Sequence, residues 1–152
     1  ATGKELTYVA LPYDNAMPFY RVRLSIGDIN GQAGSALTAE TRIILREWRG
    51  AGVPVILNGS LVFEVKVAWV GLAAKNNYVL AALQAELSAK MISFAGTLAP
   101  DIPIERADLF AIAKSIEGFA GVPKDTLVVP SDDVIPPPGY TTRIRAKDVS
   151  FT

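Results

Sequence analysis

The stretch VPVILNGSLVFEVKVAWV at residues 53–70 carries the clearest structural pattern in the chain. Its β-branched and aromatic residues favour strands. Asn58 and Gly59 divide it, and an Asn-Gly pair tolerates the positive φ angles of a tight turn, so we predict a hairpin. In the second half of the stretch, apolar residues alternate with Glu64 and Lys66. This alternation predicts a sheet with one covered face and one wetter face.

Two helices are predicted downstream of the hairpin. Apolar residues recur every three or four positions across residues 76–98, as on the buried face of a helix, and residues 105–117 repeat this spacing. Short strands are expected at 126–129 and 140–151, with a proline-rich turn between them. Two helices packed on one face of a mainly antiparallel sheet would bury both apolar stripes, which predicts an α+β fold.

A smaller β-β-α lobe is predicted upstream. Residues 4–11 and 19–26 are rich in aromatic and β-branched residues and favour strands. Thr38 is the predicted N-cap of a helix that runs to Arg49 and ends at the glycines that follow. The inward face of this helix is predicted to hold Leu37, Thr41, Ile44, Leu45 and Trp48.

The chain length suits two small lobes that share one hydrophobic core. We assign residues 1–52 to the β-β-α lobe, as the end of a preceding domain, and residues 53–152 to the α+β domain. The chain begins Ala1-Thr2-Gly3-Lys4, with neither an initiator methionine nor a signal-like region, so we expect a piece excised from a longer protein.

Composition excludes several functional classes. The 152 residues contain neither histidine nor cysteine, which removes disulfides, thiolate nucleophiles and the commonest general base. Fifteen basic and fifteen acidic residues cancel, which argues against a surface that binds nucleic acid. The apolar runs are shorter than the about 20 residues that span a membrane. Neither nucleic acid nor membrane is therefore an expected partner.

The glycine loop at Gly27–Gly34 is the main candidate for a ligand site. It follows a predicted strand and precedes a helix, whose free backbone amides could hold a phosphate. The spacing matches neither the dinucleotide nor the P-loop fingerprint, so an ordinary connection is the simpler interpretation. Asp28 to Gln32 also resembles the start of a calcium loop, but Ala33 and Ala39 stand where glycine and glutamate are required. A small-molecule or nucleotide-binding module that uses this loop remains the alternative function.

Acidic and serine residues give weaker enzymatic hypotheses. Asp132 and Asp133 could hold Mg²⁺ in a hydrolase or transferase, although aspartates are also common in turns. Ser60, Ser115 and Ser131 lack both a nucleophile elbow and a histidine partner. We therefore predict no enzyme, no catalytic residue, no metal site and no cofactor.

Two residues are candidates for an interface. Trp48 and Arg49 lie together near a predicted helix end, and Trp and Arg are enriched at binding hot spots. A core position for Trp48 is the competing interpretation, because apolar helix positions are usually buried. Trp69 alternates with core-type residues and is predicted to be buried.

From about residue 37 to its end, the chain resembles the C-terminal part of the baseplate J-like family, the wedge proteins of contractile phage tails and related injection machines. The resemblance rests on the order of several short passages. These are LREWRGAGVPV at 45–55, the Val-rich strand at 62–70, the long and the short helix, FAGVP at 119–123, the loop around Pro130 and RIRA at 143–146. In this pattern, the structural turn residues are Asn58, Gly59, Gly121, Val122, Pro123 and Pro130.

The resemblance implies a structural role without a cofactor or catalysis. Proteins of this family assemble around the tail tube, together with copies of themselves and a second wedge protein. We therefore expect a virion protein of the tail baseplate that is assembled in the cytoplasm of a bacterial host. Its expected partners are other wedge subunits and copies of itself, with no small-molecule substrate.

Overall fold

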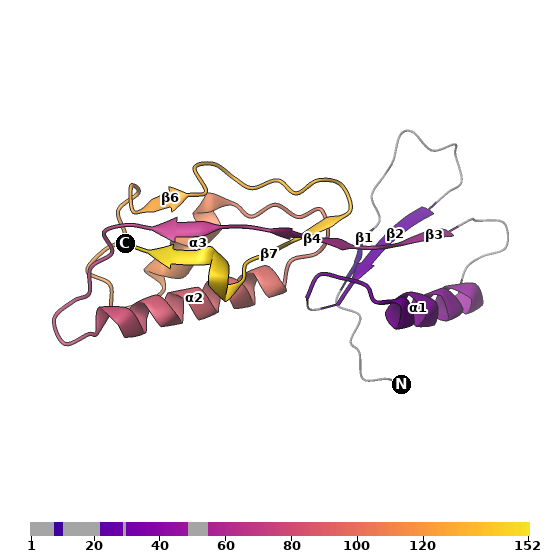
Figure 1. The fold of residues 1–152 in the computed structure, drawn as a ribbon, viewed down its shortest axis with the longest axis horizontal. Helices are drawn as coiled ribbons and strands as arrows, with labels where there is room; N and C mark the ends of the chain where they lie inside the picture. Colours follow the sequence, from indigo (N-terminus) through magenta and orange to yellow (C-terminus); the bar gives the residue numbers. More distant parts are fainter. Residues whose placement is uncertain (1–7, 11–21, 29, 49–54) are drawn as a thin grey trace. The chain divides into compact units, whose positions relative to one another are not determined.

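The structure, a computed structural model, describes residues 8–10, 22–28, 30–48 and 55–152. Helices and small sheets alternate along the chain (Figure 1), which confirms the α+β class. The chain forms two compact units. The first comprises residues 1–63, 99–102 and 136–141, and the second comprises residues 64–98, 103–135 and 142–152. The first unit thus continues to residue 63, beyond the boundary that the sequence placed after residue 52.

In the first unit, a helix connects two parallel strands. β1 (Tyr8–Ala10) pairs antiparallel with β2 (Val22–Gly27), and β2 pairs parallel with β3 (Val55–Gly59). Helix α1 (Ser35–Trp48) makes the crossover between β2 and β3, as parallel pairing requires. The predicted β-β-α lobe is therefore extended by a third strand.

Helix α1 begins three residues earlier than predicted. The Thr38 backbone N–H and hydroxyl both donate to the Gly34 carbonyl, at 3.0 and 3.1 Å. Thr38 therefore lies inside the helix, and its prediction as the N-cap is wrong. Leu37 and Thr41 are buried as predicted, whereas Ile44 is 56% exposed. An inward position for Ile44 is also wrong, because the buried stripe of this helix is narrower than its apolar stripe.

The predicted hairpin at Asn58-Gly59 is wrong. Asn58 and Gly59 belong to β3, where they pair with Ser25 and Ile26 of β2. The Ser60 N–H donates to the Ile26 carbonyl at 2.7 Å, and the chain then runs on into β4 (Leu61–Glu64) without folding back. The parallel partner binds the backbone groups on one side of this segment. A pair that tolerates a turn therefore stays extended.

The second unit is built around a three-stranded mixed sheet. β5 (Val67–Trp69) lies between β6 (Leu127–Val129), which is antiparallel to it, and β8 (Val149–Phe151), which is parallel to it. The sheets of the chain are thus mixed, and the expectation of a mainly antiparallel sheet is corrected. The short β4–β7 pair, with β7 at Tyr140–Arg143, includes residues of both units.

The single terminal strand predicted at residues 140–151 is divided in two. A short 3-10 helix, η1 (Ala146–Asp148), separates β7 from β8. The two pieces consequently pair with different strands, β4 and β5.

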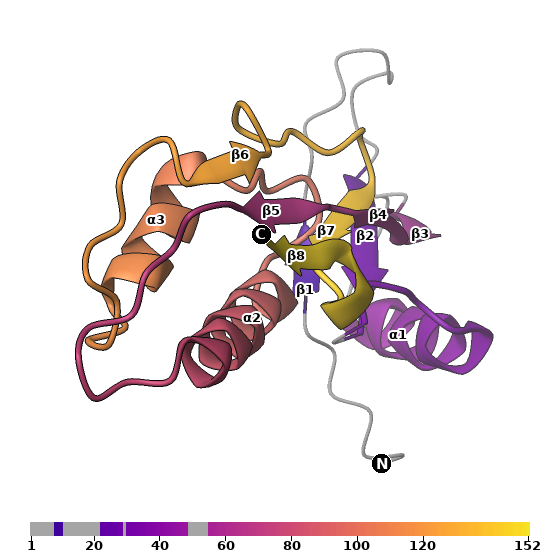
Figure 2. The same cartoon turned by 60° about the vertical axis from the view of Figure 1, so that its left-hand side comes forward.

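The helices of the second unit are α2 (Leu80–Gly96) and α3 (Arg106–Lys114), which pack beside each other along the sheet (Figure 2). Asn77 has a φ of 76°, which a helix excludes, so α2 begins later than the predicted residue 76. The core of this unit includes Val65, Val67, Trp69, Leu83, Leu87, Met91, Leu109 and Leu127. The Trp69 and Phe110 rings meet edge to face at 5.6 Å, which joins β5 to α3.

The predicted difference between the two sheet faces is confirmed. Val65, Val67 and Trp69 are at most 4% exposed, whereas Glu64 and Lys66, which alternate with them, are exposed. Alternation along residues 64–69, which run from the end of β4 through β5, therefore identified the buried face correctly.

Candidate functional site

In the loop at Gly27–Gly34, the Asp28 carboxylate accepts hydrogen bonds from backbone N–H groups of the same loop. The Asp28 Oδ1 atom accepts the N–H groups of Asn30 and Gln32 at 2.9 and 3.2 Å. The Asp28 N–H donates to the Gln32 carbonyl at 2.8 Å, and the Gly31 N–H donates to the Asp28 carbonyl at 2.9 Å. A phosphate would have to compete with this carboxylate for the same amides. The geometry is that of an aspartate-stabilised turn, which supports the ordinary connection.

The loop also packs tightly against the ends of the two parallel strands. A Cβ added to Gly27 would lie 3.2 Å from the Gly31 carbonyl carbon, and one added to Gly59 would lie 3.3 Å from the Ala33 Cβ. The space above the strand ends is thus filled by the loop itself. In α/β sheets this is the position at which ligands commonly bind.

The Asp132-Asp133 pair serves the fold of the second unit. The Asp133 Oδ1 atom accepts the backbone N–H of Arg106 at 2.8 Å, at the first residue of α3. The carboxylate therefore caps a helix whose own N-cap residue, Glu105, makes no side-chain cap bond. Asp132 is exposed and accepts the Ser131 hydroxyl at 3.3 Å. Across the described ranges, no group of three or more acidic residues could hold a metal ion.

Arg106 completes this cluster. Its guanidinium donates to the carbonyls of Ser131 and Leu127, the latter at 2.9 Å, and lies 5.7 Å from the centre of the Phe110 ring. The arginine thus holds β6 and the loop after it against the start of α3. Sequence reasoning missed this role, because the carbonyls that the guanidinium binds are more than twenty positions away.

The Ser60 and Ser115 hydroxyls are both hydrogen-bonded within the fold. The Ser60 hydroxyl is hydrogen-bonded to the Thr141 hydroxyl in a buried position. The Ser115 hydroxyl donates to the Ile112 carbonyl at 2.6 Å, as expected at the end of a helix. These contacts explain Ser60 and Ser115 without catalysis.

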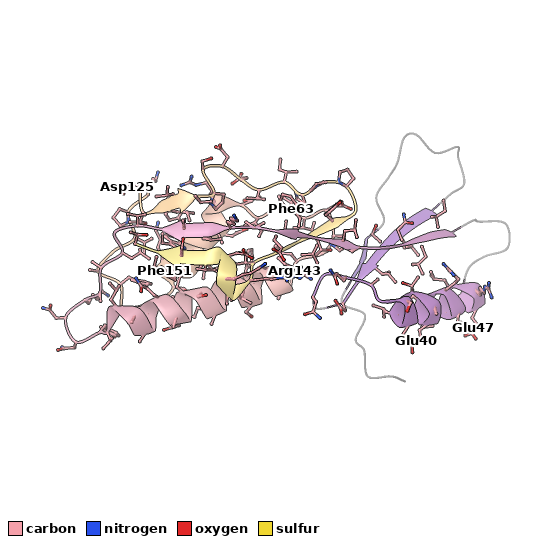
Figure 3. All side chains as sticks on the ribbon, viewed as in Figure 1. Glu40, Glu47, Phe63, Asp125, Arg143 and Phe151 are labelled. Carbon is pink, nitrogen blue, oxygen red and sulfur yellow. The ribbon has the colours of Figure 1, made fainter. Side chains whose placement is uncertain are left out.

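Arg143 is the second residue whose role sequence reasoning missed. It is 5% exposed, and its Nη1 atom donates to the carbonyls of Ala95, Leu98 and Thr142 at 2.8, 3.1 and 2.8 Å. Figure 3 shows this side chain at the C-terminal end of α2. The positive charge therefore meets the negative end of the α2 dipole.

A surface ion cluster joins β4 to the segment after β7. Glu64 accepts Arg145 at 3.0 Å and Lys147 at 3.1 Å. The Lys147 hydrogen bond is the main cause that holds the pKa of Glu64 below its ordinary value; desolvation opposes it, and the charges of Arg145 and Lys147 add to the lowering. Because these side chains are exposed, the cluster contributes little to stability.

The candidate interface residues lie at the edge of the described region. Trp48 ends α1, but its side chain and the whole of Arg49 are outside the described residues. On the same helix, Ile43 and Ile44 are 57% and 56% exposed. They are the described apolar side chains of α1 that are available to a partner.

The second unit also exposes apolar side chains. Val128 and Val129 of β6 are 50% and 40% exposed, and Ile135 is 77% exposed. Because β6 is an edge strand, the Val128 and Val129 side chains stand beside backbone groups that could pair with another strand.

The turn residues that were predicted from the resemblance fall into two groups. Asn58 and Gly59 are strand residues, as described above. Gly121, Val122 and Pro123 lie in the connection between α3 and β6, where Gly121 has a φ of 140° and the Pro123 carbonyl accepts the Thr126 N–H at 3.1 Å. Pro130 is buried directly after β6.

Comparison with known proteins gives no relative, since no protein-family model and no curated protein matches this chain. Within the part of the chain that the structure describes, no helix is long and apolar enough to cross a membrane.

Proposed function

We propose that this chain is a structural assembly protein, a component of a phage tail baseplate wedge that acts through protein–protein contacts. The order of passages between residues 37 and 152 supports the baseplate assignment. Copies of the chain and other wedge subunits are the proposed partners. The proposed location is the virion, after assembly in the cytoplasm of the bacterial host.

The observation that carries this proposal is the exposure of large apolar side chains on regular elements. Ile43 and Ile44 stand on α1 of the first unit, and Val128 and Val129 stand on β6 of the second. Single exposed apolar residues are normal, but two exposed isoleucines in one turn of a helix, together with exposed valines on an edge strand whose backbone can pair, favour contact with a partner.

The contacts of the acidic residues that were considered as ligand or metal sites support the same proposal. Asp28 binds the amides of its own loop, and Asp133 caps α3. A group used in this way is not free to bind substrate or metal. The nucleotide-binding alternative keeps one favourable feature, since its loop follows a strand of a parallel pair, but Asp28 already occupies the loop amides.

The test is the solution mass of the chain, measured by light scattering over a concentration series. We expect dimers or larger assemblies to form as concentration rises, unaffected by Mg²⁺ or nucleotide. Replacing Ile43 and Ile44 together by lysine, or Val128 by lysine, should weaken this association, because a charge must then be desolvated at the contact. Ala39→Lys is the matched control for α1, since Ala39 is exposed on the same helix.

Two results would overturn the proposal. One is a monomer at every concentration that also fails to bind any wedge subunit. The other is a chain whose thermal stability rises with nucleotide, which would favour the ligand-binding alternative by mass action.

A further inference from the structure

The chain contains two Asn-Gly pairs, Asn30-Gly31 and Asn58-Gly59, in different structural settings. In such a pair, the glycine backbone nitrogen can attack the asparagine side-chain carbonyl carbon, because glycine has no Cβ to obstruct the approach and rotates freely. The reaction requires a free glycine N–H and an asparagine side chain that can turn toward it. The two pairs differ in both respects.

At Asn58-Gly59 the reacting groups are free. The Ser60 N–H donates to the Ile26 carbonyl, and successive backbone groups of a strand point to opposite sides, so the Gly59 N–H faces away from β2. Asn58 and Gly59 are both exposed. Among the described residues, none makes a side-chain hydrogen bond to Asn58. The attack also requires Asn58 to leave its extended conformation, and among the described strands β3 is an edge strand that pairs with β2 alone.

At Asn30-Gly31 the same groups are held. The Gly31 N–H donates to the Asp28 carbonyl at 2.9 Å, and the Asn30 Nδ2 atom donates to the Asp28 Oδ2 atom at 3.3 Å. Asp28 Oδ1 also accepts the Asn30 backbone N–H. The nearby carboxylate further disfavours the peptide anion that acts as the nucleophile. The hydrogen bonds of this turn therefore keep the Gly31 N–H and the Asn30 side chain from reacting with each other.

We propose that Asn58 is a site of spontaneous covalent modification by deamidation, and that Asn30 is protected from it. The Gly59 nitrogen forms a bond to the Asn58 Cγ atom, the Cγ–Nδ2 bond breaks, and ammonia leaves with the proton from Gly59. Water then opens the succinimide at either carbonyl and yields aspartate or isoaspartate. No oxidant or reductant takes part.

The modification changes β3 in two ways. Either product places a carboxylate on a strand that pairs with β2 over Val55–Gly59. Isoaspartate also lengthens the main chain by one methylene, which displaces Gly59 from its register with Ile26. The first unit would therefore lose order with age, whether or not the chain assembles as proposed above.

The experiment compares the two sites within one protein. The folded chain is incubated at mildly alkaline pH, and aspartate and isoaspartate are quantified at each site by peptide mass spectrometry after proteolysis. We expect deamidation to be at least about fivefold faster at Asn58 than at Asn30, the factor that corresponds to the net contribution of one hydrogen bond. Asn58→Gln should remove the fast product, because a longer side chain does not form the five-membered ring.

The same incubation in concentrated urea is the control for local sequence. Both pairs follow a large aliphatic residue, so their rates should become nearly equal once the fold is lost. Equal rates in the folded chain, or a faster reaction at Asn30, would overturn the proposal. A preference for Asn58 that persists unchanged in urea would also overturn it, because the cause would then lie in the sequence and not in β3.

Discussion

Replacing Arg143 by methionine tests the physical account of the second unit. The guanidinium is 5% exposed, and its Nη1 atom donates to three carbonyls, two of them at the C-terminal end of α2. Hydrogen bonds to a charged group contribute about 1.5–3 kcal/mol each, and the helix dipole adds about 0.3–1 kcal/mol. Methionine fills a similar volume and avoids the desolvation of a charge, which offsets part of this loss. We expect a destabilisation of about 2–4 kcal/mol.

The assay is urea unfolding followed by the fluorescence of Trp69, which is 1% exposed and belongs to the same unit. A Trp48→Phe background removes the other tryptophan. Arg145→Met is the matched control, since Arg145 is 48% exposed and pairs with Glu64, so its loss should cost less than about 1 kcal/mol. If Arg143→Met and Arg145→Met have equal effects, the reasoning that assigns Arg143 to the helix end is wrong.

Three further predictions concern single side chains. Gly118→Ala places a Cβ 2.6 Å from the Tyr78 Cδ1 atom and closer still to Leu83, so thermal unfolding should show a loss of about 1–3 kcal/mol from overpacking; wild-type stability would contradict this. Asp133→Ala removes the cap of α3 and should cost about 0.5–2 kcal/mol in urea, with no change in Mg²⁺ binding; a lost Mg²⁺ affinity would revive the metal hypothesis. The pKa of Glu64 is lower in the folded chain than its ordinary value of 4.5. Its contribution to the free energy of unfolding is therefore present above pH 4.5 and is lost as the pH falls through the folded-state pKa. Glu64→Gln should therefore flatten the stability profile in that acidic range, and an unchanged profile would contradict the ion cluster.

Local patterns in the sequence determined which residues are buried along individual elements. Alternation identified Val67 and Trp69 as core residues and Lys66 as exposed. Glu86 and Lys90, four positions apart on α2, meet at 3.0 Å, as this spacing favours on a helix. These inferences succeed because they depend on neighbours two to four positions away, whose geometry is set by the element itself.

The tertiary structure alone decided which elements meet. Asn58-Gly59 carries a strong local turn preference, yet it stays extended because it pairs with β2, some thirty positions earlier. Nothing in the sequence around Arg143 or Asp133 distinguishes them from other charged residues. Their roles arise because each lies against the end of a distant helix. The N-terminal end of a helix favours a negative charge and the C-terminal end a positive one. Which side chain reaches each end depends on long-range packing that no local pattern in the sequence contains.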